Sequence, residues 1–160
     1  MDRHRLRTTF EEVPALYDRV RPAYPVGVLD NLVALAKLPD DGRIVEIGCG
    51  TGQATLPLAE RGFEMICVEL GAGLAAVARR KLAPFPKVEI VNALFETWEP
   101  NAGAFDAVVA FTAFHWIDPE VRYSKAARLL REGGALAVVA TQHVLTEDGD
   151  RFFADVQGGL

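Results

Sequence analysis

Three glycines separated by single residues, Gly48, Gly50 and Gly52, follow a short apolar run and precede a segment with a helical pattern. The stretch VEIGCGTGQATLPLAERG runs from Val45 to Gly62. Glycine adopts backbone angles closed to other residues and lets the main chain approach a ligand closely. Alternating glycines at a strand end therefore predict a ligand-binding loop. A tight strand-to-helix turn without a ligand is the alternative.

Short apolar runs alternate along the chain with helical patterns, which is typical of a parallel sheet flanked by helices. Each run is almost continuously apolar, as expected for strands covered on both faces. The predicted strands are Ile44–Ile47, Met65–Leu70, Val88–Asn92, Asp106–Phe111 and Ala135–Thr141. The sequence therefore predicts an α/β fold with a mainly parallel sheet.

The helical segments are bounded by caps and helix breakers. The predicted helices are Pro14 to about Val20, Val26–Leu38, Gln53–Arg61, Ala72–Leu82 and Pro119–Arg131, with a further helix start at Asp150–Val156. Asp118 is expected as an N-cap and Gly62 as a C-cap. The segment Arg21–Pro25 is expected to be extended, because a residue that precedes proline disfavours helical angles.

Composition and charge exclude several classes of partner. A chain of 160 residues, 50% hydrophobic and 24% charged, is the size of one soluble domain. The net charge of −5 and the scattered basic residues argue against nucleic-acid binding. No apolar run is long enough to span a bilayer, so we predict no membrane partner and a cytoplasmic location. Cys49 and Cys67 lack metal-ligand spacing and are expected to be reduced and buried, with no metal site.

An acidic residue ends the second predicted strand. Glu69 lies nineteen residues after Gly50, and at about this spacing an acidic side chain binds the hydroxyl groups of a ribose. Because ligands of open α/β sheets bind at the carboxyl ends of the strands, the loop and Glu69 together indicate a ligand that contains adenosine. A strand-end carboxylate exposed to solvent is the alternative for Glu69.

The spacing of the loop narrows the choice of ligand. A dinucleotide site requires G-x-G-x-x-G facing a pyrophosphate, whereas this loop reads G-x-G-x-G. Glu46, near the end of the first predicted strand, is a poor neighbour for a pyrophosphate but a tolerable one for a cation. S-adenosylmethionine fits, because it has a ribose, an ammonium and a sulfonium but no phosphate.

At this point the chain resembles the class I S-adenosylmethionine-dependent methyltransferases. The resemblance rests on Val45–Gln53, Glu69, Phe105–Asp118 and Leu129–Val139 and covers nearly the whole chain. The phrases YDRVRPAYP and AFHWID resemble in particular the small-molecule methyltransferases of the methyltransferase type 11 and trans-aconitate-like groups. The resemblance implies a Rossmann-like methyltransferase fold. Residues 1–25 would form an N-terminal helix and a cofactor-covering segment, and residues 26–160 the S-adenosylmethionine-binding domain.

The resemblance also implies roles for the residues of the glycine loop and its surroundings. Gly48, Gly50 and Gly52 would surround the methionine part and the ribose of the cofactor. Glu46 would orient the cofactor, and Glu69 would hold the ribose hydroxyls.

The adenine would lie between the loops that follow the second and third strands. By resemblance, Leu70 packs on the adenine and the segment Asn92–Glu96 passes its edge. Family members commonly carry an acidic residue at the position of Leu94, so adenine recognition here is expected to rest on main-chain groups near Leu94 and Phe95. Thr112, after the fourth strand, is expected near the methionine part of the cofactor.

Two further sets of residues are candidates for the site. Tyr17, Arg21 and Tyr24 are predicted to fold over the cofactor, with Arg21 binding a carboxylate in a bidentate manner; ordinary packing or surface roles are the alternative. His115 is the candidate catalytic residue, because a histidine beside the acceptor accepts a proton from a hydroxyl or an amine. A structural histidine between two aromatic residues is the alternative.

The leading functional prediction is in-line methyl transfer to a small molecule, which requires alignment of the reacting atoms but no dedicated nucleophile. The alternatives are an S-adenosylmethionine-binding module without turnover and a nicotinamide-dependent oxidoreductase. The resemblance implies a C-terminal antiparallel hairpin that this sequence does not supply, so a truncated or shortened chain is expected. The strand at residues 135–140 then becomes an edge, and we predict self-association through it.

Overall fold

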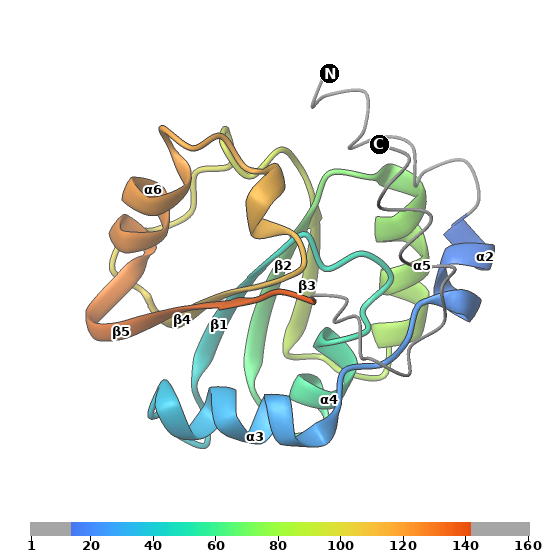
Figure 1. Ribbon diagram of the computed structural model, residues 1–160, viewed down its shortest axis with the longest axis horizontal. Coiled ribbons are helices and arrows are strands. Elements are labelled where there is room, and N and C mark those ends of the chain that lie inside the picture. The colour runs from blue at the N-terminus through green and yellow to red at the C-terminus, as the bar shows by residue number, and fades with distance from the viewer. Residues whose placement is uncertain (1–13, 142–160) are drawn as a thin grey trace, which may run out of the picture.

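The computed structural model describes residues 14–141 of the chain, and the helix predicted at Asp150–Val156 lies outside them. Five strands form one sheet in the order β3-β2-β1-β4-β5 (Figure 1). Every pairing between neighbouring strands is parallel, as predicted. The strands are β1 (Arg43–Ile47), β2 (Glu64–Glu69), β3 (Val88–Asn92), β4 (Phe105–Phe111) and β5 (Leu130–Val139).

Helices cover both faces of this sheet. Figure 1 shows α3 and α4 on one side of the sheet and α6 on the other, with α2 beside α5. The helices are α2 (Pro14–Val20), α3 (Val26–Leu35), α4 (Thr55–Ala59), α5 (Ala72–Leu82) and α6 (Arg122–Leu129), with a short 3-10 helix η2 (Phe114–Trp116). None of the helices within residues 14–141 has the length and apolar character that a membrane crossing requires.

Two hydrophobic cores explain why the strands are apolar throughout. In β1, Ile44 packs into the core shared with α3, α4 and α5, whereas Val45 and Ile47 belong to the core shared with α6. Ile44, Val45 and Ile47 are each at most 1% exposed. Successive side chains of a strand point to opposite faces, so a strand covered on both sides needs apolar residues at nearly every position.

Two boundaries around α6 differ from the prediction. The helix begins at Arg122, because Asp118 forms a turn in which its carboxylate accepts a hydrogen bond from the backbone N–H of Glu120 at 2.9 Å. It ends at Leu129, where β5 starts directly by pairing Leu130 with Phe105. Gly133, with a φ of 75°, therefore lies inside β5 near an irregularity in the β4–β5 register.

The other helices agree more closely with the prediction. The bounds of α2 and α5 match it, while α3 ends at Leu35 and α4 spans only Thr55–Ala59. Gly62 has a φ of 92°, and its N–H donates to the carbonyl of Ala59 at 3.0 Å, so it ends the turns after α4 as expected.

Candidate functional site

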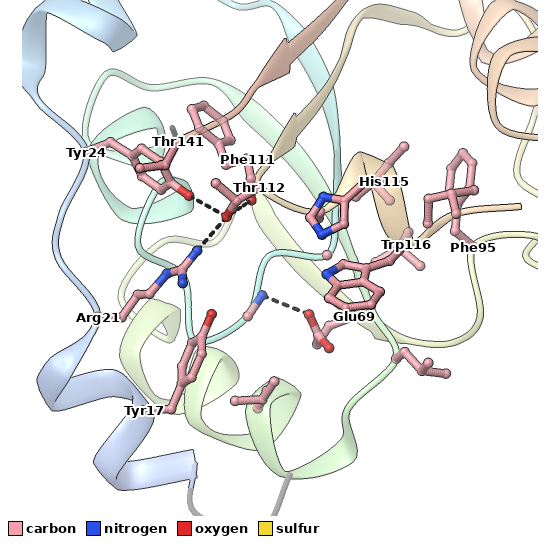
Figure 2. A pocket seen from close by; sticks show the side chains of 18 of the residues that line it. Tyr17, Arg21, Tyr24, Glu69, Phe95, Phe111, Thr112, His115, Trp116 and Thr141 are labelled. Carbon is pink, nitrogen blue, oxygen red and sulfur yellow. Dashed lines mark hydrogen bonds between the residues drawn. The ribbon is translucent and has the colours of Figure 1, made fainter. Parts of the chain in front are cut away.

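A cavity of about 720 Å³ opens at the carboxyl ends of the strands (Figure 2). This volume is in the range of small-molecule sites. The lining comes from the loops after β1, β2, β3 and β4 and from the segment after α2. The predicted site residues in this lining are Tyr17, Arg21, Gly48, Gly50, Glu69, Leu70, Leu94, Phe95, Thr112 and His115. Folding thus brings together segments that are up to about a hundred residues apart in sequence.

The glycines of the loop after β1 serve different purposes. Gly48, Gly50 and Gly52 have φ values of 66°, 59° and 88°, a region that disfavours side chains. A Cβ atom added at Gly48 lies 2.6 Å from the Cβ of Ala113, so the loop after β4 also requires a glycine there. Gly52 packs against Leu82 of α5 and is not part of the cavity lining, which differs from the expectation that it surrounds the ligand.

Gly48→Ala is expected to lower the free energy of unfolding by about 2 kcal/mol, because the methyl group combines a left-handed φ with a clash against Ala113. Urea denaturation measures this change. The control is Gly27→Ala on the exposed surface of α3, where an added Cβ meets no atom within 4 Å and stability should stay level or rise. Equal stability of Gly48→Ala and the wild type contradicts the packing argument.

Glu69 lies at the floor of the cavity and is 6% exposed. Its two carboxylate oxygens accept hydrogen bonds from the backbone N–H groups of Gly50 and Gly71, each at 2.8 Å. The carboxylate therefore joins the glycine loop to the start of α5, and each of its oxygens can accept more than one hydrogen bond. This burial and pairing rule out the alternative of a solvent-exposed strand end.

Asn92 is a supporting residue that the sequence indicated only as the start of the segment near the adenine. Its side-chain amide donates to the carbonyl oxygens of Glu69 and Leu70, at 2.9 and 2.8 Å. The end of β3 thus holds the backbone of the loop that carries Glu69. A polar amide at the end of an apolar strand is the sequence signal for such a role.

Glu46 lies beneath the glycine loop and not in the cavity lining, which differs from the expectation that it orients the ligand. The side chain is 1% exposed and accepts a hydrogen bond from the Thr55 hydroxyl at 2.7 Å. The Cys67 thiol lies 3.9 Å from the same carboxylate oxygen. Burial raises the pKa of Glu46 to about 7, and the nearby charge of Glu69 adds to this effect. Glu46 thus links β1 to α4 and β2 from below.

The segment after α2 lines the cavity. Figure 2 shows Arg21 and Tyr24 converging on Thr112 at the end of β4. The Arg21 guanidinium donates to the Thr112 hydroxyl at 2.5 Å, and the Tyr24 hydroxyl lies 3.1 Å from the same oxygen. Thr112 has a φ of 53° and donates its own hydroxyl proton to the carbonyl of Phe111. The segment after α2 is therefore hydrogen-bonded to the end of β4. Thr112, at this strand end, is expected to lie near the ligand.

The helix α2 is fastened beside the glycine loop. Asp18 accepts hydrogen bonds from Lys81 of α5 at 3.0 Å and from Gln53 at 3.2 Å. Partial burial alone would raise the pKa of Asp18, but the interactions of its carboxylate with Thr51 and Lys81 outweigh burial and hold the pKa below its ordinary value. Tyr17, on the same helix, lies against Gly50, where an added Cβ atom would be 3.5 Å from the tyrosine ring. No side chain of α2 is buried, so these polar contacts fix its position.

His115 lies in η2 on the opposite wall, with its ring centroid 4.6 Å from that of Trp116. Partial burial lowers the pKa of His115, so its imidazole is neutral near pH 7. A neutral imidazole in the cavity lining can accept a proton from a bound hydroxyl or amine. The two rings are tilted by 44°, a contact that also meets the expectation for a structural histidine beside an aromatic residue.

Part of the cavity lining is apolar and comes from the segments that follow β2 and β3. We call this part, formed by Leu70, Leu74, Leu94 and Phe95, the apolar slot. Phe95 is 3% exposed and belongs mainly to the core. Glu96 also lines the cavity, and its carboxylate accepts a hydrogen bond from the backbone N–H of Asp118 at 3.1 Å. The sequence indicated Glu96 only as the last residue of the segment Asn92–Glu96, which is expected to pass the edge of the adenine.

Comparison with known proteins identifies the family. A family model described as a methyltransferase domain matches residues 44–134. An uncharacterized methyltransferase of Mycobacterium tuberculosis is 31% identical over 137 residues, which are 86% of this chain and 54% of that protein. A trans-aconitate 2-methyltransferase of Variovorax paradoxus is 32% identical over 78% of this chain and 48% of its own length.

The fold is also shared with solved structures. The CcbJ methyltransferase from Streptomyces caelestis superimposes with a TM-score of 0.66 at 24% identity, over 89% of this chain and 66% of that one. The present chain spans about half the length of the curated relatives it matches. The matched residues 44–134 contain the glycine loop, Glu69 and both loops of the apolar slot. The chain therefore belongs to the S-adenosylmethionine-dependent methyltransferase family.

Proposed function

We propose that this chain binds S-adenosylmethionine in the cavity and transfers its methyl group to a small molecule. The observation that carries the proposal is the hydrogen bond between the Gly50 N–H and Glu69, which places a buried carboxylate beside a glycine loop at the strand ends. A carboxylate in this position suits the two hydroxyl groups of a ribose. Membership of the methyltransferase family supports the assignment.

The residues of the cavity fit the parts of this cofactor. Glu69 would bind the ribose hydroxyls, and the slot between Leu70 and Leu94 would hold the adenine. Arg21, at the Thr112 end of the cavity, would bind the carboxylate of the methionine part. Gly48 and Gly50 allow the backbone to approach the ligand closely. The bound cofactor supplies an activated methyl group.

The chain's contribution to the reaction is mainly positional. The walls of the cavity would align the acceptor with the methyl group, and such alignment contributes roughly 7–11 kcal/mol in favourable cases. Tyr17, Arg21 and Tyr24 would limit the access of water from the covering side. His115 would accept a proton where the acceptor is a hydroxyl or an amine, whereas a carboxylate acceptor needs no base.

The relative named as a trans-aconitate 2-methyltransferase supports a small-molecule acceptor. A module that binds the cofactor without turnover remains the second candidate; the chain spans about half the length of its curated relatives. The cavity lining also contains the aromatic groups of Tyr24 and Trp116. This composition favours an acceptor with an apolar part.

Calorimetric titration with S-adenosylmethionine, S-adenosylhomocysteine and NAD tests the proposal. We expect micromolar binding of the first two and none of NAD. Methylation of any acceptor in a panel of small carboxylates, phenols and amines would then establish the enzyme over the binding module. Binding of NAD alone would favour the oxidoreductase, and the absence of all binding would overturn the assignment for this chain.

The strand β5 supports the prediction of self-association. Within residues 14–141 it pairs only with β4, and its Val138 is 49% exposed. We propose that two copies of the chain pair through this strand, because β5 has no second strand partner within the described residues and such an edge attracts another strand. Sedimentation at several concentrations should show dimers that Val138→Lys disrupts; a stable monomer throughout contradicts the proposal.

A cytoplasmic location, which the free thiols of Cys49 and Cys67 support, likewise remains a prediction.

A further inference from the structure

The side chain of Lys125, on the inner face of α6, is buried although it carries a charge. Lys125 is 4% exposed and does not line the cavity. Lysine is almost never buried to this extent unless it is paired. The partners of its ammonium therefore show what the burial achieves.

All the contacts of this ammonium are made with one short segment after β3. Lys125 Nζ donates to the carbonyl oxygen of Glu96 at 3.0 Å and to a carboxylate oxygen of Glu99 at 3.2 Å. It also lies 5.4 Å from the ring centroid of Phe95. A carbonyl, a carboxylate and an aromatic face are all electron-rich, so the contacts depend on the positive charge and not only on packing.

The contacted segment is the cavity wall formed by Leu94, Phe95 and Glu96. Residues 93–104 connect β3 to β4 without a regular helix or strand, so no backbone ladder fixes the wall. The N–H groups of Thr97 and Trp98 donate to the carbonyl of Leu94, and two further bonds hold the segment, from the Ala93 N–H to the carbonyl of Glu69 and from the Asp118 N–H to the Glu96 carboxylate. Lys125 thus ties an irregular wall to a helix packed on the sheet.

We propose that Lys125 is a positioning residue that holds the wall of Leu94, Phe95 and Glu96 at the distance required by the adenine. This inference rests on the proposed function, because it assigns the wall to the adenine of S-adenosylmethionine. Lys125 acts through the Glu96 carbonyl and the Phe95 ring and does not touch the ligand. Without its ammonium the wall relaxes away from the slot.

The test compares Lys125→Met, which keeps the volume of the side chain but has no donor, with Lys125→Arg, which retains donors. Calorimetry with S-adenosylhomocysteine is expected to show about fivefold weaker binding for the methionine variant, the equivalent of one lost hydrogen bond. The arginine variant should recover most of the affinity. Arg128→Met is the matched control on the same helix, because Arg128 binds only the exposed side of Glu99 at 2.8 Å.

Hydrogen exchange of the free proteins gives a readout that does not depend on the ligand. Lys125→Met should raise amide exchange in residues 93–99 but leave β1 and β4 protected, whereas Arg128→Met should not. Unchanged exchange in residues 93–99, or equal losses of affinity in Lys125→Met and Lys125→Arg, would overturn the inference. The wild type could also fail to bind S-adenosylhomocysteine while Lys125→Met still raises exchange in residues 93–99. That result would uphold the positioning of the wall by Lys125 and overturn the proposed function.

Discussion

Glu69→Ala is expected to weaken the binding of S-adenosylhomocysteine by about 100-fold. Each hydrogen bond from a hydroxyl to a buried carboxylate contributes about 1.5–3 kcal/mol, and the ribose offers two such hydroxyls. The variant also leaves the N–H groups of Gly50 and Gly71 without their acceptor, so the glycine loop loses part of its support. Calorimetry on the folded variant, with its fold checked by circular dichroism, measures the loss.

A matched control separates the ribose contact from a general effect on β2. Glu64→Ala removes a carboxylate at the opposite end of the same strand, where it pairs with Arg43 at the surface, and should leave the affinity unchanged. A 2′-deoxyribose analogue of S-adenosylhomocysteine keeps the 3′-hydroxyl, so Glu69→Ala should weaken its binding by about 10-fold, which is less than the loss expected for the parent compound. If the analogue and the parent compound lose affinity equally on substitution, Glu69 does not contact that hydroxyl.

The free energy of unfolding is expected to fall by about 3 kcal/mol as pH rises from 4.5 to 7, through the contribution of Glu46. Burial raises the pKa of this carboxyl from 4.5 in the unfolded chain to about 7 in the folded one. Between these values the folded state holds a proton that the unfolded state has released, so stability decreases with rising pH. Below this window the contribution is fully present, and above about pH 7 it is lost.

Denaturation curves of the wild type and Glu46→Gln between pH 4 and pH 9, a range chosen to bracket the two pKa values, isolate this contribution. The glutamine keeps the size of the side chain and can accept the hydrogen bond of Thr55 without titrating. The stability of the variant relative to the wild type should therefore grow with pH and level off above about pH 7. Glu60→Gln, at the exposed residue that follows α4, is the control for a general effect of replacing a glutamate by glutamine. A parallel curve for Glu46→Gln would mean that Glu46 titrates as in the unfolded chain.

Much of the fold was predictable from the sequence, because a buried parallel strand requires an apolar residue at nearly every position. The range Val88–Asn92 of β3 matches its predicted bounds, and so do the ranges of α2 and α5. The start of α6 was not predictable in the same way. Asp118 satisfies the same local pattern whether its carboxylate caps a helix or closes a turn, and the structure shows the turn.

The candidate site was also predictable from the sequence only in part. Glycine spacing and the position of Glu69 identified the loop and the strand end, because backbone angles and strand order are local properties of the chain. Where Glu46 lies depends on its neighbours in space, and the structure places it against Thr55 below the loop instead of in the cavity. The contacts of the predicted residues with a ligand stay predictions.

The sequence by itself determined the parallel α/β architecture, the glycine loop and the acidic strand end, since each is encoded in the spacing of a few neighbouring residues. Only the tertiary structure decided which charged groups are buried and what they hold. The ammonium of Lys125 meets the wall after β3 from 29 positions away in sequence, and Arg21 reaches Thr112 across 91. No local pattern encodes such contacts, because they arise only when the sheet brings the ends of its strands together.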